Sequence, residues 1–211
     1  MKPSIYLFSL IFLSIILYGK PSTPQEWINV KLVNDGDTIV LANGRHVRYI
    51  GINAPEINHE GQKAEPFGYK AKIFNKRLLV NKRIRLEMDK EKNDRYGRLL
   101  AYVFRQDGMF INKVMIEEGY AYFLPLNPNI KFNKILLKAQ QNAMKAQKGI
   151  WNNWQEKENV YWGNRRSKRF HHPECPFGKR IKKTNRRVFT RKWDAFWAGY
   201  APSKRCVEFW K

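Results

Sequence analysis

Cysteine is scarce in this chain: Cys175 and Cys206 are the only two among 211 residues, and both lie near the C-terminus. Their position excludes a disulfide framework for the first 174 residues, which must therefore be stabilised by packing alone. An apolar content of 43% is sufficient to build a core of that kind.

Long apolar runs are also nearly absent, and the single candidate is residues 5–18, preceded by Lys2. This run has the length of the apolar region of a secretory signal and is short for a membrane span. We therefore expect residues 1–24 to direct secretion or periplasmic export. The alternative is an uncleaved N-terminal anchor that leaves the protein facing outside the cytoplasm.

Acidic residues are few: 18 Asp and Glu stand against 40 Lys and Arg, which gives a formal net charge of +22. A surplus of this size attracts polyanions and accelerates their capture, although it does not bear on the fold. It favours a nucleic-acid partner. A membrane-surface binder and an ordinary basic protein remain alternatives at this stage.

The hydrophobic pattern predicts five short strands, three helices and a basic tail. Alternation places strands at 27–33, 38–41, 46–52, 83–88 and 99–104, and the Asn43-Gly44 dipeptide predicts a hairpin turn between the second and third. Helical spacing covers 66–81, 112–119 and 132–147. Short strands with interspersed helices suit an α+β fold built on a small closed barrel of the OB type.

The predicted boundaries are a barrel domain over 25–154 and a C-terminal module over 155–211. The module contains 16 basic and 5 acidic residues, so a surplus of 11 positive charges lies in the last 57 residues.

Three carboxylates flank the predicted hairpin. Asp35 and Asp37 surround Gly36, and Glu56 follows the third strand. Pairing through the turn would bring both segments to one end of the hairpin, where their oxygens could hold a hard cation such as Ca²⁺. The alternative is that these acids only accept hydrogen bonds from turn backbone.

Two arginines complete a possible site for phosphate chemistry. Arg48 lies within an apolar strand, and Arg98 opens the strand at residue 99. Arginine binds phosphate with a fixed fork of donors, and two such groups could offset charge that develops on phosphorus while Glu56 activates water. Taken singly, each arginine could equally be an exposed surface charge.

The combination resembles the thermonuclease, or staphylococcal nuclease-like, family. The matching segments occur in family order and span about residues 27–153: VNDGDTIVL, VRYIGINAPE, DRYGRLLAYVF, MFINKVMIEEGYA and KGIWNN. The resemblance implies a five-stranded OB barrel with three helices, and Ca²⁺-dependent endonuclease cleavage of phosphodiester bonds in DNA and RNA. It implies no obligate protein partner.

By position, the resemblance assigns catalysis to Glu56 as general base and to Arg48 and Arg98 on the phosphate. Tyr96 matches a tyrosine beside the nucleotide, and Arg95 next to it is a second candidate for nucleic-acid contact. The tyrosines that stack on a base in the family have no convincing counterpart, and Tyr120 and Tyr122 are better explained as core or rim residues.

The metal ligands implied by the resemblance are Asp37, Asn53 and the backbone carbonyl of Ala54. Asn53 departs from the family pattern, which has an aspartate there, so we expect weaker metal binding. A catalytically silent OB-fold nucleic-acid-binding protein is therefore the alternative function.

The C-terminal module resembles a degenerate zinc module of the Ada type. Its four ligand positions read His171, Cys175, Ser203 and Cys206, and serine is a poor Zn²⁺ ligand. Three interpretations stay open: a three-ligand zinc site, a Cys175–Cys206 disulfide, or two free thiols. The aromatic residues of the module could stack on bases, but residues 193, 196, 197 and 200 also follow the spacing of one helix face, which favours a small core.

Overall fold

The structure of the protein is a computed structural model that describes residues 26–58, 63–156 and 158–205. The predicted signal peptide or anchor, residues 1–24, lies outside the described residues. Within the part of the chain that is described, no helix combines the length and apolar character needed to cross a membrane.

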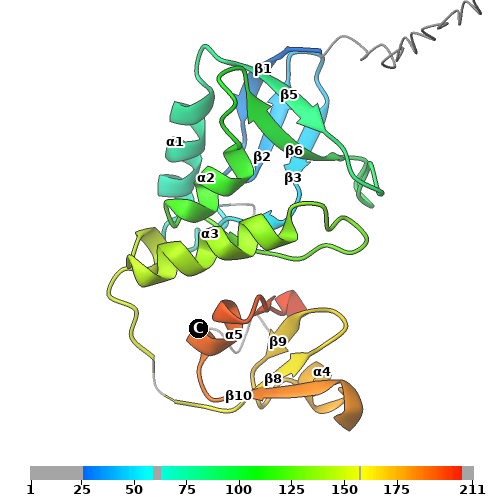
Figure 1. The fold of residues 1–211 in the computed structure, drawn as a ribbon, viewed down its shortest axis with the longest axis vertical. Helices are drawn as coiled ribbons and strands as arrows, with labels where there is room; N and C mark the ends of the chain where they lie inside the picture. The colour runs from blue at the N-terminus through cyan, green and yellow to red at the C-terminus, as the bar shows by residue number, and fades with distance from the viewer. Residues whose placement is uncertain (1–25, 59–62, 157, 206–211) are drawn as a thin grey trace, which may run out of the picture.

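Five strands form a closed barrel in the order β1-β2-β3-β6-β5, at the top of Figure 1. They are β1 (Ile28–Val33), β2 (Thr38–Leu41), β3 (His46–Tyr49), β5 (Arg83–Glu87) and β6 (Leu99–Arg105). The parallel pairing of β3 with β6 and the antiparallel pairing of β1 with β5 complete the ring. The predicted OB-type barrel is confirmed.

The barrel forms where the sequence places apolar residues. All four residues of β2 are buried, and Ile39 pairs with Val47 across the hairpin. The turn between β2 and β3 forms at Asn43-Gly44, where the Gly44 N–H donates to the Leu41 carbonyl at 2.9 Å. This pairing sets Thr38 opposite Arg48, next to Asp37 at the same end of the hairpin.

The predicted strand over 46–52 is wrong in extent, because it divides into β3 and β4 (Ile52–Asn53). Gly51 takes a φ of 79°, and a Cβ there would lie 2.5 Å from Leu136 Cδ1, so only glycine allows this turn out of the barrel. Beyond it, β4 pairs with β7 (Tyr122–Phe123) in a separate two-stranded sheet. This break carries Asn53 and Glu56 away from the barrel wall.

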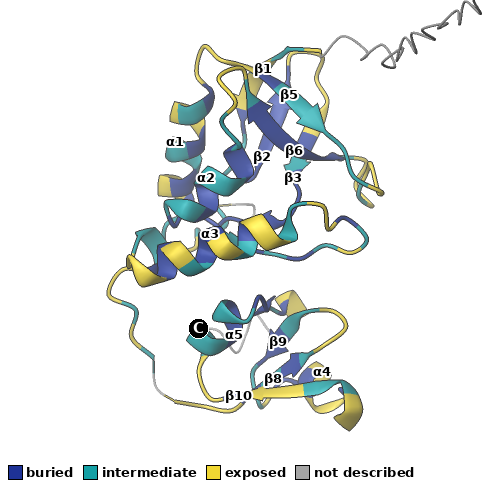
Figure 2. Ribbon diagram, viewed as in Figure 1, coloured by how far each residue is buried: buried dark blue, intermediate teal, exposed yellow. Residues whose placement is uncertain are grey.

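Three helices accompany the barrel, as predicted, with slightly shorter bounds: α1 (Gly68–Leu79), α2 (Ile111–Glu117) and α3 (Asn133–Lys145). Helix α1 lies beside the barrel, and α3 runs between the barrel and the C-terminal module (Figure 1). Figure 2 shows buried and exposed stripes alternating along α3, and the buried positions include Leu136, Gln140 and Met144. After α3, a short 3-10 turn η1 (Gly149–Trp151) leads into the connection.

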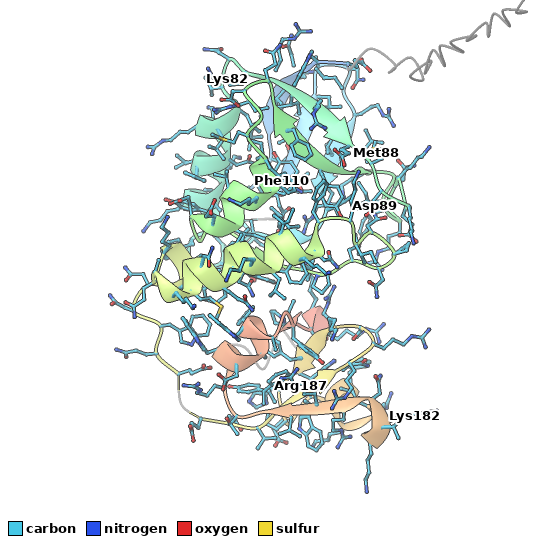
Figure 3. The ribbon with its side chains drawn as sticks, in the orientation of Figure 1. Lys82, Met88, Asp89, Phe110, Lys182 and Arg187 are labelled. Carbon is cyan, nitrogen blue, oxygen red and sulfur yellow. The ribbon has the colours of Figure 1, made fainter. Side chains whose placement is uncertain are left out.

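The C-terminal module is built on a four-stranded sheet in the order β10-β8-β9-β11. Its elements are β8 (Tyr161–Asn164), β9 (Arg169–His171), α4 (Pro176–Lys179), η2 (Lys183–Asn185), β10 (Arg186–Phe189), α5 (Lys192–Trp197) and β11 (Ala201–Pro202). Figure 3 places Lys182 at the end of the module that lies farthest from the barrel.

A second hydrophobic cluster joins this module to α3, the last helix of the barrel domain. Met144 and Trp151 pack in one cluster with Phe170, Phe196 and Tyr200. The preference for a small core over base stacking is confirmed for this cluster, although α5 ends at Trp197 and leaves Tyr200 beyond the helix. The boundary between residues 154 and 155 stays a prediction, because packing crosses it.

Candidate active site

Asp37 lies at the centre of the candidate site, immediately before β2, and is 6% exposed. Its Oδ2 accepts hydrogen bonds from the Ala54 backbone N–H at 2.7 Å and lies 3.0 Å from Arg48 Nη2. Its Oδ1 accepts a hydrogen bond from the Thr38 hydroxyl at 3.1 Å. The predicted meeting of the two ends of the hairpin therefore occurs.

Gly36 makes this meeting possible. A Cβ at Gly36 would lie 2.4 Å from the Cβ of Ala54 and 2.8 Å from that of Ala71, so a side chain there would push the two segments apart. Asp35 then accepts a hydrogen bond from the Asp37 N–H at 2.8 Å. The Asp-Gly-Asp turn thus accepts a hydrogen bond from its own backbone and directs Asp37 at Ala54, while the metal role of Asp37 stays a prediction.

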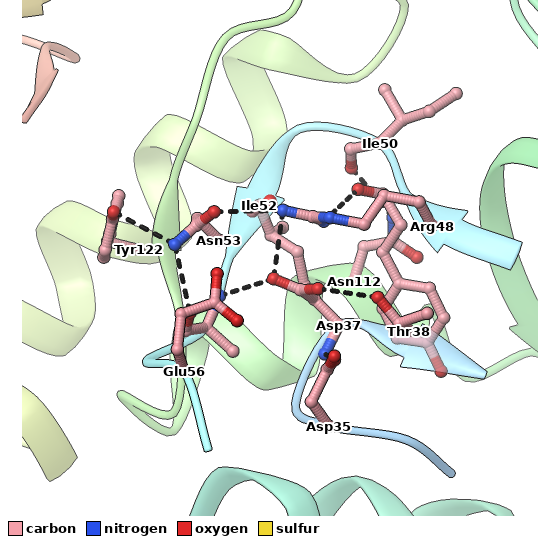
Figure 4. Close-up of polar contacts among 12 residues, drawn as sticks. Asp35, Asp37, Thr38, Arg48, Ile50, Ile52, Asn53, Glu56, Asn112 and Tyr122 are labelled. Carbon is pink, nitrogen blue, oxygen red and sulfur yellow. Dashed lines mark hydrogen bonds and ion pairs between the residues drawn. The ribbon is translucent and has the colours of Figure 1, made fainter. Parts of the chain in front are cut away.

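Arg48 is held by four oxygen atoms. Its Nη1 donates to the carbonyls of Tyr49 and Ile52, at 2.8 and 2.9 Å, and its Nη2 donates to Asn53 Oδ1 at 3.0 Å and pairs with Asp37 (Figure 4). The guanidinium thereby ties the barrel strand β3 to the β4 segment. The alternative of an exposed surface charge is excluded for Arg48, whose side chain is 13% exposed.

The Asn53 side chain, on β4, forms three hydrogen bonds. Its side-chain oxygen accepts from Arg48, while its Nδ2 donates to the Ala54 carbonyl and to the Tyr122 hydroxyl, both at 3.0 Å. An ionised aspartate has no donor, so it could not donate to the Ala54 carbonyl, and its hydrogen bond with Tyr122 would have to be donated by the tyrosine hydroxyl. The departure from the family pattern is thus matched by the local partners of the amide.

Glu56 lies beside this cluster (Figure 4). Its backbone N–H donates to Glu65 Oε2 at 2.9 Å, and its side-chain Oε1 lies 3.1 Å from Lys204 Nζ, which comes from the C-terminal module. The Glu56 side chain is 37% exposed, so solvent reaches the carboxylate.

Arg98 approaches from the loop before β6. Its Nε and Nη2 both lie 2.7 Å from Asp94 Oδ2, which fixes the direction of the fork. The Tyr96 ring is 67% exposed, and the guanidinium carbons of Arg95 and Arg98 lie 4.7 and 5.4 Å from its centroid. This group offers cations and an open aromatic face to solvent.

An open cleft of about 470 Å³ joins these groups. Glu56 and Arg98 line it together with Asp35, Thr38 and Lys72. Asp37 and Arg48 do not line the cleft, but Asp37 lies in the chain next to the lining residue Thr38, and Arg48 pairs with Thr38 across the hairpin. Of the predicted site residues, Asp37, Arg48, Asn53 and Ala54 contact one another, and Glu56 and Arg98 line the cleft.

The electrostatics of Asp37 set it apart from the other acids. Burial raises the pKa of Asp37 to about 7, the charge of Arg48 opposes this rise, and the charge of Asp35 adds to it. In contrast, the hydrogen bonds from Arg98 and from backbone N–H groups hold the pKa of Asp94 below its ordinary value, although its partial burial acts in the other direction. A buried carboxylate whose negative charge is only partly neutralised by its neighbours favours the binding of a cation.

The donor set is chemically consistent with Ca²⁺ but poor in charge. The available atoms are oxygens: the Asp37 carboxylate, the Asn53 amide and the Ala54 carbonyl, and Ca²⁺ takes such ligands together with water. Among the residues that the structure describes, no group of three or more His, Cys, Asp or Glu side chains is arranged to hold a metal. An ion at this site would therefore depend on carbonyl, amide and water ligands.

In the C-terminal module, three of the four positions that match the zinc-module pattern lie close together. His171 Nδ1 lies 3.7 Å from Cys175 Sγ, and the Ser203 N–H donates to the Phe170 carbonyl at 2.9 Å, next to His171. Cys175 is disulfide-bonded, and the chain's only other cysteine, Cys206, lies outside the described residues. The structure thus favours the disulfide over a zinc site.

Sequence reasoning missed two participants. Tyr122, interpreted as a core or rim residue, also accepts the Asn53 hydrogen bond while its ring packs on Phe196 at 5.4 Å between centroids. Lys204 is 148 positions from Glu56 in the chain, and no local pattern signals their contact. The only related signal in the sequence is the excess of basic residues in the C-terminal module.

The comparisons with known proteins agree with this geometry. Residues 46–153 match the family model described as "Staphylococcal nuclease homologue". The chain is 38% identical over 138 residues to a thermonuclease of Staphylococcus hyicus, which covers 64% of this chain and 81% of the relative. A thermonuclease of Staphylococcus intermedius is 42% identical over 125 residues, or 58% of this chain and 74% of the relative.

A further relative is the endonuclease YncB of Bacillus subtilis, 35% identical over 144 residues, which are 63% of this chain and 68% of the relative. The matches to these three proteins involve only about three fifths of the present chain.

Proposed function

The chain belongs to the staphylococcal nuclease family and is a nuclease that hydrolyses phosphodiester bonds, and we propose that it is an exported, Ca²⁺-dependent endonuclease of DNA and RNA. The observation that carries the proposal is the convergence of Asp37, Arg48 and Asn53 next to Thr38, which lines one cleft together with Glu56 and Arg98. The rival of a catalytically silent binder would not need this arrangement of base, buried carboxylate and guanidinium groups.

In the proposed reaction Glu56 is the general base. Its carboxylate accepts the proton of a water molecule in the cleft as the water oxygen attacks phosphorus. The bond from phosphorus to the leaving oxygen breaks, and that oxygen takes up a proton from solvent. Arg98, aligned by Asp94, binds the phosphate oxygens from the cleft wall. Arg48 holds the Asp37 and Asn53 side chains next to each other and contributes positive charge near the phosphate.

Asp37, the Asn53 amide oxygen and the Ala54 carbonyl would hold the metal ion. When bound, Ca²⁺ would supply positive charge that stabilises the phosphate in the transition state. For Asn53 to take part, its amide would have to exchange its Arg48 contact for the ion. This requirement, together with the missing charge, supports the expectation of weak metal binding.

Nucleic-acid contact is proposed for Tyr96 and Arg95. The exposed ring is available for stacking on a base, and the adjacent guanidinium groups can neutralise backbone phosphates. Neither contact reads a base edge, so we propose activity on both DNA and RNA.

Export is supported by the bonding state of Cys175. Structural disulfides persist in oxidising compartments, which include the periplasm and the extracellular space. We therefore retain secretion or periplasmic export as the proposed location, with a tethered nuclease facing outside the cytoplasm as the alternative.

Digestion of plasmid DNA and of a structured RNA by the full-length protein tests the function. We expect both to be degraded with Ca²⁺ present and to survive in excess chelator, with activity restored when Ca²⁺ is returned. Intact nucleic acid under all conditions, from folded protein that still binds the plasmid in a gel-shift assay, would instead support the silent binder.

A further inference from the structure

A second cavity, of about 530 Å³, lies within the C-terminal module and is separate from the cleft at Glu56. Three arginines line it, Arg169, Arg180 and Arg205, together with His171, Ser167 and Ser203. Among the described residues its lining includes no aspartate or glutamate. A concave surface with several guanidinium groups, hydroxyl donors and no carboxylate has the chemistry of an anion site.

Arg169, on β9, is the most enclosed of the three cations. Among the described residues, its guanidinium donates only to backbone carbonyls: Ser167 and Lys168 through Nη1, at 3.4 and 3.5 Å, and Pro125 through Nη2, at 3.3 Å. These distances are long for charged hydrogen bonds, which are usually about 2.7–2.9 Å. Within the described part of the chain no carboxylate forms an ion pair with it, whereas Arg48, Arg98, Arg105 and Arg191 each have one.

Among the described residues, no ion pair therefore compensates the loss of water around the Arg169 guanidinium. Burial lowers the pKa of Arg169 from its ordinary value, and the cause is the loss of water around a positive charge. A protein gains little from such a charge in the absence of an anion, since an unpaired buried cation is costly. Its five donors are only partly used, which leaves capacity for a ligand.

The other two arginines lie at the exposed rim. Arg205 is placed over the Phe177 ring, with its guanidinium carbon 5.0 Å from the centroid, and this contact restricts its orientation. Burial and the charge of Arg205 both lower the pKa of His171. One enclosed and two rim arginines can surround a tetrahedral anion from different sides.

The cavity borders the nuclease barrel. Ser203 and Arg205 flank Lys204, which contacts Glu56. Arg169 contacts Pro125, which follows β7, and Tyr122 of β7 binds Asn53 in the active site. In the sheet order β10-β8-β9-β11, β10 is the strand farthest from the barrel in Figure 1, and β9 lies closer to it. An anion in the cavity would therefore lie near a strand bound at Glu56.

We propose that this cavity binds a backbone or terminal phosphate of the nucleic-acid substrate, at a position away from the phosphodiester that is cleaved. The inference rests on the proposed function for the identity of the ligand. The shared chemistry is a phosphate group, which could come from a nucleic-acid strand or from free inorganic phosphate, and we commit to the strand because the cavity borders the cleft.

Direct binding tests the proposal without cleavage. A fluorescein-labelled single-stranded oligonucleotide is titrated with the full-length Glu56→Gln protein in chelator, and affinity is read by fluorescence anisotropy at two salt concentrations. We expect Arg169→Gln to weaken binding about tenfold, in line with one lost charge-assisted contact, and to reduce the salt slope by about one phosphate contact.

Arg187→Gln is the matched control. It removes the same chemical group from the same module, but Arg187 lies on β10, over Phe189, and does not line the cavity. We expect a change of at most about twofold, because only the general field is altered. Since Arg169 is enclosed, Arg180→Gln and Arg205→Gln at the exposed rim provide variants that do not threaten folding, and each is expected to weaken binding more than the control.

The outcomes are distinct. Losses at Arg169, Arg180 and Arg205 that exceed the loss at Arg187 support the proposal, and equal losses at all four positions overturn it. If millimolar inorganic phosphate raises the melting temperature of the wild type but not of Arg169→Gln, while oligonucleotide affinity is unchanged in that variant, the cavity binds free phosphate and the substrate assignment is wrong. Failure of the proposed function would appear separately, as absence of cleavage by a wild type that binds the oligonucleotide.

Discussion

Lys204 Nζ lies 3.1 Å from Glu56 Oε1, so the C-terminal module contributes a cation to the candidate general base of the barrel. Both side chains are substantially exposed, 70% for Lys204 and 37% for Glu56, and exposed pairs of this kind contribute between about zero and 1 kcal/mol. The contact is therefore weak enough for substrate and water to displace it.

From this contact we predict a modest gain in rate on removing the lysine. Lys204→Ala removes a cation that competes with the attacking water for the Glu56 carboxylate. We therefore expect kcat at low salt to rise by up to about fivefold, the equivalent of about 1 kcal/mol. The difference should disappear at high ionic strength, where the pair is screened in the wild type. Steady-state cleavage of a fluorogenic oligonucleotide measures both.

The control for this prediction is Lys182→Ala, which removes a lysine at the far end of the module (Figure 3). We expect it to leave kcat unchanged. A fall in kcat for Lys204→Ala would contradict the competition and would show that the lysine assists the reaction.

Asn53→Asp should strengthen metal binding. The substitution adds a second carboxylate next to Asp37, and we expect the Kd for Ca²⁺ to fall on the order of tenfold, because ligand charge sets the affinity of oxygen sites. The cost is the loss of the two donated hydrogen bonds to Ala54 and Tyr122, which should lower the stability of the metal-free protein.

Isothermal titration calorimetry measures the change in Ca²⁺ affinity. Urea unfolding in chelator measures the change in stability of the metal-free protein. Tyr122→Phe separates the two, since it removes the hydroxyl acceptor and keeps the ring on Phe196. Equal Ca²⁺ affinity in wild type and Asn53→Asp would remove position 53 from the metal site.

The raised pKa of Asp37 predicts an unusual pH dependence of stability. Burial raises this pKa from 3.8 to about 7, so between these values the folded protein binds more protons than the unfolded chain. The free energy of unfolding in chelator should therefore fall as pH rises through this window, with a contribution from Asp37 of up to about 1.4 kcal/mol per pH unit. Below pH 4 the contribution is constant.

Ca²⁺ should reverse this trend, because the ion binds the ionised carboxylate and competes with the proton. Urea unfolding at pH 5 and pH 8, with chelator and with Ca²⁺, measures the effect, and Asp37→Asn is the variant that should lose the Asp37 contribution. A metal-free wild type whose pH dependence is identical to that of Asp37→Asn would refute the raised pKa.

The shared cluster of Met144, Trp151 and Phe196 predicts that the barrel and the C-terminal module unfold together. Phe196→Ala should lower the free energy of unfolding by about 3–5 kcal/mol, the usual cost of deleting a buried ring. Val188→Ala, at a position that is 57% exposed, should change it by less than about 0.5 kcal/mol. Thermal unfolding in two separate transitions would contradict this coupling.

This packing also changes how the role of the basic tail should be tested. Deleting residues 155–211 should weaken DNA binding and flatten its salt dependence, but the deletion would also expose Met144 and Trp151 and confuse a loss of charge with a loss of structure. Single charge substitutions on the module avoid this difficulty.

The barrel and the chemistry of the site could be predicted because their signals are local. Alternation predicted β5 and a short apolar run predicted β2. The Asn43-Gly44 turn set the register that places Thr38 opposite Arg48, and the resemblance assigned the remaining roles. The break at Gly51 was missed because an apolar run continues through it, and the clash with Leu136 that requires glycine arises only after α3 docks.

The contributions of the C-terminal module lay beyond sequence reasoning for the same reason. The contact of Lys204 with Glu56 and the packing of Phe196 on Tyr122 depend on how two distant segments dock, and no spacing in the chain encodes that geometry. The four strands β8 to β11 were also missed, because each has only two to four residues and too little alternation to detect.

The most direct test of the account is the single-turnover rate of phosphodiester cleavage by Glu56→Gln, across Ca²⁺ concentrations, against wild type and Glu117→Gln. Glu117 pairs with Lys113 on the surface and is about as exposed as Glu56, so it is a matched control. We predict a loss of about 10²–10⁴-fold for Glu56→Gln at saturating Ca²⁺, with oligonucleotide affinity retained, and no loss for Glu117→Gln. Cleavage by Glu56→Gln at the wild-type rate would contradict the assignment of the general base, and with it the proposed mechanism.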